Sequence, residues 1–150
     1  MRYLLFALAL TLPAADLTTK KSLNLAVIKE MVVAAEAEAA KLGVEVSLAI
    51  VDEAGNLLYF QKHDKPGLNT VIFAQKKARS AAIYRRTSKV QNEALTKGNL
   101  AMLSMPDAFP VQGGVPIMVD GQCLGAVGAS GATSEQDEQI SQAAINAIKK

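Results

Sequence analysis

The sequence predicts a single α+β domain in which an antiparallel β-sheet carries helices on one or both faces. Short apolar runs come in pairs joined by turn residues, so hairpins, and not single strands, alternate with helical segments. The chain also has 150 residues, half of them apolar, which suits one domain with a sizeable core and is too short for two ordinary domains. The expected order is helix, two strands, two helices, a loop, two strands and a helix.

The first 15 residues differ in composition from the rest of the chain. Arg2 is followed by an apolar run from Leu4 to Leu12 and then by Pro13-Ala14-Ala15. This order predicts a signal peptide (1–15) that is cleaved after Ala15, with residues 16–150 as the mature domain in the periplasm or outside the cell. The apolar run is too short to span a membrane. The alternative is an N-terminal apolar strand or helix of a cytosolic protein.

A helix and a hairpin are predicted next. Thr18 or Thr19 is expected to cap the helix, and Gly43 to end it. Residues alternate between apolar and polar from Val44 to Ile50, and the run from Leu57 to Gln61 returns after a turn, which predicts two antiparallel strands. The apolar residues of the helix recur at three- and four-residue spacings: Leu25, Ile28, Met31, Val32, Ala35, Ala39 and Leu42.

A polar turn that contains His63, the only histidine, precedes a helix predicted from Asn69 to about Tyr84. Lys77 falls inside the apolar stripe of this helix. We expect its long side chain to reach past its neighbours to water. The alternative is that the ammonium group pairs with an anion, because a buried charge needs a partner.

The segment after this helix is expected to be short and partly irregular. Ser88 and Gln91 have the spacing of a capping box for a third helix, which Gly98 ends. From Asn99 to Gln112 we expect an irregular loop that either takes part in function or only covers the edge of the sheet. Its apolar contacts would come from Met102, Met105 and Phe109.

The stretch from Gly113 to Asp137 predicts strand, tight turn, strand and helix. Val115–Val119 and Cys123–Ala129 flank Asp120-Gly121, a pair typical of hairpin turns in which both residues have positive φ. Small residues dominate the second strand, so something must approach it closely, either a packed helix or a ligand.

Two alternative pairs have the spacing to cap the helix that closes the chain. They are Thr133 with Gln136 and Ser134 with Asp137. The apolar residues that follow repeat at helical spacing, which predicts that this helix packs against the sheet. They are Ile140, Ala144, Ile145 and Ile148.

Composition excludes several classes of function. A net charge of +2 without tryptophan gives neither the basic face nor the stacking platform of a nucleic-acid-binding protein, so nucleic acid is not an expected partner. Cys123 is the only cysteine, which rules out a disulfide framework within the chain and predicts a small buried apolar residue. A transition-metal site held by several histidines is also excluded, since there is only one.

A haem site needs less from the chain. One or two axial ligands, an apolar slot and a cation for the propionates are sufficient. The residues able to ligate the iron are His63, Met102, Met105, Tyr59 and Tyr84.

Three segments resemble the GlcG and HbpS-like proteins, also called the haem-degrading domain family. They are AEAEAAKLGVEVSLAIVDEAGNLL, the Lys77-Ala78 helix that leads into Arg85-Arg86-Thr87-Ser88, and Gly113-Gly114-Val115-Pro116-Ile117 followed by DGQCLGAVGASGATSEQDE. The resemblance covers nearly all of the mature chain. It implies a profilin-like α+β fold, homo-oligomers, binding of haem or another tetrapyrrole in some members, and haem breakdown in a subset. Arg86 stands where the family often has proline.

Taken together, the residues and the resemblance give a first hypothesis, an exported, oligomeric binding protein for haem or a related planar cofactor. The ligand would lie between the loop 99–114 and the helix that bears Lys77. His63, or a loop methionine such as Met102 or Met105, would bind the iron. Lys77 would meet a carboxylate, and the backbone would come close to the ligand at Gly113 and Gly114.

Two other hypotheses remain open. In the first, the protein is an enzyme or binding protein for a small organic acid, with Lys77 and Arg85 as carboxylate receptors and Asp52 or His63 moving a proton. In the second, it is an accessory or assembly protein without a ligand, and its small-residue strand is an oligomer seam. The sequence does not decide whether any reaction is catalysed.

Overall fold

The computed structural model describes residues 19–149, which form one α+β domain as predicted. The elements in chain order are α1 (Leu25–Leu42), β1 (Ser47–Asp52), β2 (Leu57–Lys62), α2 (Asn69–Tyr84), α3 (Ser88–Thr96), the 3₁₀ turn η1 (Leu100–Ser104), β3 (Gly114–Val119), β4 (Gln122–Ser130) and α4 (Ser134–Asn146). The predicted signal peptide (1–15) lies outside the described residues. Within 19–149, no helix is both long enough and apolar enough to cross a membrane.

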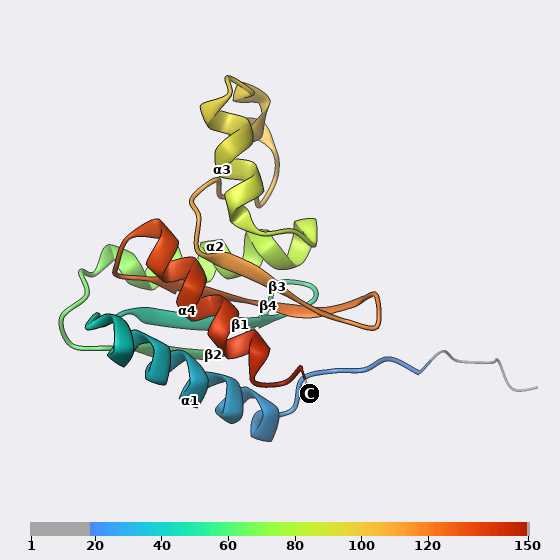
Figure 1. Cartoon of the computed structure of the whole chain (residues 1–150). Coiled ribbons are helices and arrows are strands. Elements are labelled where there is room, and N and C mark those ends of the chain that lie inside the picture. Colours follow the sequence, from blue (N-terminus) through green and yellow to red (C-terminus); the bar gives the residue numbers. More distant parts are fainter. Residues whose placement is uncertain (1–18, 150) are drawn as a thin grey trace, which may run out of the picture.

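The four strands form one sheet in the order β2-β1-β4-β3, and every neighbouring pair is antiparallel. Both predicted hairpins are confirmed, and β1 joins them by pairing with β4 (Figure 1). The second hairpin turns at Asp120 and Gly121, with φ values of 49° and 77°, as the Asp-Gly pair predicted.

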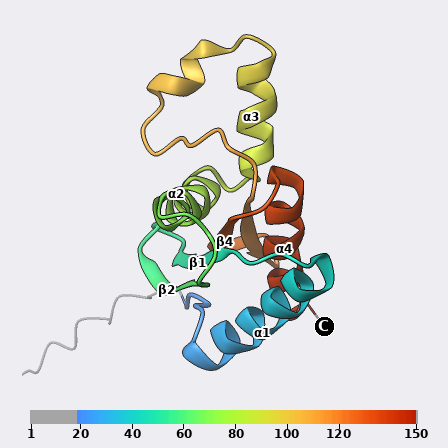
Figure 2. The same cartoon turned by 90° about the vertical axis from the view of Figure 1, so that its left-hand side faces the viewer.

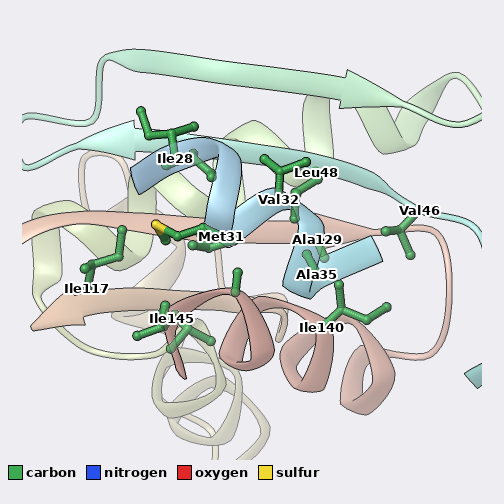
Figure 3. Packing of buried hydrophobic residues seen from close by; sticks show 14 of the residues in the cluster. Ile28, Met31, Val32, Ala35, Val46, Leu48, Ile117, Ala129, Ile140 and Ile145 are labelled. Carbon is green, nitrogen blue, oxygen red and sulfur yellow. The ribbon is translucent and has the colours of Figure 1, made fainter. Parts of the chain in front are cut away.

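Helices cover both faces of the sheet (Figure 2). α1 and α4 lie together on one face, and α2 lies on the other. The larger core lies under α1 and α4, where Met31, Ile117 and Ile140 are fully buried (Figure 3). The layer under α2 is built mostly from alanine, including Ala74 and Ala78. Small side chains there bring the helix close to the strands.

Two predicted helix starts are wrong. α1 begins at Leu25 and is capped by Asn24, whose side chain accepts a hydrogen bond from Val27 N at 3.0 Å. Thr19 precedes the helix by several residues, and Thr18 lies outside the described residues. The apolar pattern extends one residue too far, since Leu25 is 58% exposed. The predicted end of α1 at Gly43 is confirmed.

The predicted capping box of the third helix is also wrong, because tertiary contacts use both side chains. Thr87 occupies the cap position, without a side-chain hydrogen bond. Ser88 Oγ instead accepts a hydrogen bond from Gly114 N at 2.8 Å, and Gln91 Oε1 accepts one from Ser80 Oγ at 2.8 Å. The following loop contains η1, and together α3, η1 and this loop project from the sheet and its helices (Figure 1).

The cap of α4 matches one of the two predicted alternatives. Thr133 Oγ1 accepts a hydrogen bond from Gln136 N at 3.3 Å, and Gln136 Oε1 accepts one from Thr133 N at 3.2 Å.

Replacing Thr133 by alanine is expected to lower the free energy of unfolding by about 1 kcal/mol, because it removes the side-chain oxygen that accepts the hydrogen bond from Gln136 N. Urea denaturation followed by circular dichroism measures the change. Ser134→Ala is the control, and an equal loss in that variant would show that the cap is not specific to Thr133.

Candidate functional site

A buried ion pair joins α2 to α4. Lys77 Nζ donates hydrogen bonds to Asp137 Oδ2 at 2.8 Å and to the carbonyl oxygen of Ala129 at 3.0 Å. Lys77 is only 2% exposed. The expectation that this side chain reaches water is therefore wrong, and the alternative, pairing with an anion, is confirmed. The anion belongs to the chain itself.

Asp137 is held from several sides. Its Oδ1 accepts a hydrogen bond from Ala132 N at 3.1 Å, and the residue lies in the first turn of α4, where the helix dipole favours negative charge. Burial raises the pKa of Asp137 above its usual value, although the hydrogen bond from Lys77 acts in the opposite direction. Burial thus favours the neutral form of this carboxyl group, and its hydrogen bonds favour the ionised form.

Glycines allow α2 to approach the sheet beside this pair. A Cβ atom at Gly114 would collide with the carbonyl oxygen of Lys77, and one at Gly128 would collide with that of Ala74. At Gly113 a Cβ would lie 2.9 Å from Lys77 Nζ. The predicted close approach to the small-residue strand is therefore made at Gly128 by a packed helix. A further approach by a ligand stays a prediction.

A cleft of about 300 Å³ lies against the ion pair and includes both Lys77 and Asp137 in its wall. Phe73 of α2 and Val111 of the loop before β3 also line it, so it lies between the loop and the helix where the ligand was predicted. The first residues of α2 and α4 border the same space. The cleft can accept a small polar group, because both helix N-termini favour negative charge there.

His63 lies in the wall of a larger cleft of about 650 Å³. Its side chain is 39% exposed, and its Nε2 lies 3.4 Å from Gln61 Nε2 and 4.0 Å from Glu36 Oε1. Lys65 and Glu45 also line this cleft and pair at 2.7 Å, and this contact holds the pKa of Glu45 below its usual value. The remaining lining is mostly small or apolar: Ala39, Ala40, Gly43, Val44, Pro66, Gly67 and Gly131.

Met102 and Met105 line a third space, a cavity of about 120 Å³ between α3 and η1. The structure thus brings together Lys77, Gly113 and Gly114 but places His63 in one cleft and the two methionines in another cavity. The haem-ligating roles predicted for these residues stay predictions. The methionine cavity is smaller than the roughly 300–1,000 Å³ typical of small-molecule pockets.

The groups predicted for a small organic acid are also spread over the molecule. Asp52 accepts hydrogen bonds from the backbone and side chain of Asn56 in the β1–β2 turn. Arg85 follows α2 in a left-handed conformation and is exposed. Neither residue lines the cleft beside Lys77. Among residues 19–149, no three His, Cys, Asp or Glu side chains gather into a metal-binding cluster.

Two functional candidates were missed at the level of sequence. Asp137 was considered only as a capping residue, and Gln91 likewise. A signal for Asp137 was available, because a lysine in an apolar stripe requires an acidic partner, and first-turn acids of a neighbouring helix are well placed to supply one. No local signal marks Gln91 as buried, since its environment is made by distant parts of the chain.

Comparison with known proteins gives a consistent result. Residues 23–146 match the family model described as haem degrading protein HbpS-like. The protein GlcG of Escherichia coli K12 is 37% identical over 112 residues, which cover 75% of this chain and 84% of GlcG.

Solved structures share the fold. A double mutant of HbpS from Streptomyces reticuli superposes with a TM-score of 0.81 at 26% identity, over 95% of this chain and 97% of that one. The PduOC:heme complex superposes with a TM-score of 0.78 at 27% identity, over 85% of this chain and 96% of that one. These proteins have the same α+β arrangement of an antiparallel sheet and flanking helices.

Proposed function

This chain belongs to the HbpS-like family of haem-degrading proteins, and on that premise we propose that it binds haem or a related tetrapyrrole as an exported homo-oligomer. Haem-related binding is supported by the family and by the PduOC:heme complex, which shares the fold. The observation that carries the proposal for this chain is the position of His63, the only histidine, in the wall of its largest described cleft.

The residues of this cleft fit the group. A haem requires an axial ligand, an apolar slot and cations for its propionates. His63 would supply the ligand, and Ala39, Ala40, Val44 and Pro66 the apolar wall. Lys65 would supply the cation once a propionate displaced Glu45, with which it pairs at 2.7 Å. Bound haem would supply a redox-active iron. For His63 to ligate it, Nε2 must turn away from Gln61 and Glu36, both of which it approaches in the free protein.

Lys77 is less available for a propionate than the sequence suggested. Its ammonium group already contacts Asp137 and the carbonyl oxygen of Ala129. A ligand carboxylate entering the 300 Å³ cleft would have to compete with Asp137 for this charge. We therefore assign the iron-binding end of the ligand to the His63 cleft and leave the Lys77 cleft to a polar substituent, since Gly131 lines both spaces.

Export and assembly complete the proposal. The apolar leader that ends at Ala15 supports export. The edge strand β2 supports assembly, because Leu57 and Leu58 on it are 49% and 41% exposed, and Ile72 of α2 is exposed nearby. Pairing two copies along this edge would cover these residues.

Titrating the purified protein with haemin is expected to shift the Soret band, with saturation at a fixed haemin-to-protein ratio. His63→Ala should weaken binding at least 10-fold, because an axial bond is lost, and added imidazole should restore the spectrum. Reductant and oxygen added to the complex then test for haem breakdown through loss of the band.

Matched variants decide which ligand binds the iron. Met102→Leu and Met105→Leu should leave the titration unchanged, since these residues line a different cavity. A wild-type spectrum identical to that of free haemin would overturn the proposal. Loss of the band in a methionine variant, but not in His63→Ala, would move the site to the α3–η1 cavity.

A further inference from the structure

A buried amide group in α3 lacks a hydrogen-bond partner. Gln91 is 2% exposed, and among residues 19–149 its Nε2 is the only buried side-chain nitrogen or oxygen without a protein partner. Burying an N–H donor without an acceptor costs about 1–3 kcal/mol. A group with this cost is a reason to look for an acceptor that is not part of the chain.

Neighbouring hydrogen bonds favour the orientation in which the amide nitrogen is the free end. Ser80 Oγ accepts a hydrogen bond from Phe109 N at 3.0 Å, so its own hydrogen is available for Gln91 Oε1 at 2.8 Å. The reversed amide would point its NH₂ group at this oxygen and leave the serine hydrogen without that acceptor. The nitrogen is therefore the end that lacks a partner.

Gln91 lines the 120 Å³ cavity between α3 and η1, together with an arginine and several apolar side chains. Arg86 donates a hydrogen bond through Nε to Tyr84 O at 3.4 Å, and in the described part of the chain no carboxylate forms an ion pair with it. No acidic residue lines the cavity. Its apolar lining consists of Val90, Ala94, Met102 and Met105.

These groups define the chemistry of a ligand. The free N–H calls for an oxygen acceptor, Arg86 favours a negative charge, and the methionines favour a short apolar chain. The cavity has room for about four water molecules at ~30 Å³ each, so the ligand must be small. We propose that the α3–η1 cavity binds a small aliphatic monocarboxylate, with Gln91 Nε2 donating to a carboxylate oxygen and Arg86 balancing its charge.

This site differs from the one proposed for haem. It shares no lining residue with the His63 cleft or with the cleft beside Lys77. It also differs from the predicted organic-acid site, which used Lys77 and Arg85. Occupation of the cavity and binding of haemin are therefore expected to be independent.

The probe is butyrate, titrated into the full chain and followed by the side-chain amide resonances of Gln91 in ¹H–¹⁵N spectra. We expect a saturable shift of these resonances with butyrate but not with butan-1-ol, which lacks the charge. Gln91→Glu, which keeps the size but places a carboxylate against the ligand, should weaken binding more than 10-fold. Arg86→Gln should weaken it by up to about fivefold, because this side chain is exposed.

Lys89→Gln is the matched control, because Lys89 is an exposed cation on the same helix but does not line the cavity. Its butyrate affinity should stay within twofold of the wild type. Haemin titration of Gln91→Glu should match that of the wild type and so show that the variant is folded and that the two sites are separate. If Gln91→Glu does not fold, the butyrate titrations of the wild type and of Arg86→Gln test the proposal instead.

The proposal is overturned if butyrate produces no saturable shift, or if butan-1-ol produces the same one, since the cavity then holds water only. It is also overturned if a folded Gln91→Glu binds butyrate as tightly as the wild type. These results would leave the haem proposal intact, because the haemin titration tests it separately.

Discussion

Replacing Lys77 by methionine is expected to lower the free energy of unfolding by about 3–5 kcal/mol. The substitution preserves most of the side-chain volume but leaves the Asp137 carboxylate buried beside the sheet without its cation. For a domain of this size the midpoint of thermal unfolding should fall by roughly 10–20 °C. Thermal and urea denaturation followed by circular dichroism measure both quantities.

A second substitution separates loss of the ion pair from loss of packing. The double variant Lys77→Met/Asp137→Asn lacks both the ammonium group and the carboxylate, so no unpaired charge stays buried. It should therefore be more stable than Lys77→Met alone. Lys29→Met, at an exposed position of α1, should change stability by less than about 0.5 kcal/mol. If the double variant is less stable than Lys77→Met by the full cost of Asp137→Asn, the two residues are not coupled.

The hairpins and helices could be predicted because their signals are local. The Asp120-Gly121 turn needs two residues with positive φ, and the pair that suits this conformation stands between two apolar runs. α2 was bounded correctly at Asn69 and Tyr84 by its apolar period. Cys123 is buried in β4, as its isolation in an apolar strand indicated.

The starts of α1 and α3 could not be placed because cap residues compete. Thr19 and Asn24 both suit a cap, and sequence does not say which the backbone will use. Ser88 and Gln91 satisfy the capping-box pattern, yet their side chains accept hydrogen bonds from Gly114 and Ser80 and do not cap the helix. These partners lie 26 and 11 residues away, beyond the reach of a local pattern.

The candidate site was predicted as a set of residues and not as an arrangement. Lys77 was correctly singled out, but its partner lies 60 residues further along the chain, and no spacing rule connects the two. His63 and Met102 were named as alternative iron ligands of one site, although the fold places them in separate spaces. Such separation depends on how hairpins and helices pack, which residue types alone do not specify.

Gly128→Ala is expected to lower the free energy of unfolding by about 3 kcal/mol, at the upper end for overpacking. The added methyl group would collide with Ala74 O and lie 2.6 Å from Ala78 N. Both atoms belong to the backbone of α2, so no side-chain rotation relieves the contact. The helix would have to move away from β4, and Lys77, which lies on the same helix, would move relative to Asp137 and Ala129. Urea denaturation measures the loss.

Gly67→Ala provides the matched control for this effect. A methyl group there would meet only the side-chain oxygen of Asn69, an exposed residue that can rotate away, so little stability should be lost. Because Gly128→Ala and Lys77→Met both disturb the contact between α2 and β4, their combined loss should be smaller than the sum of the single losses. Strict additivity, or equal stability of Gly128→Ala and Gly67→Ala, would mean that α2 does not pack on β4 as closely as the structure shows.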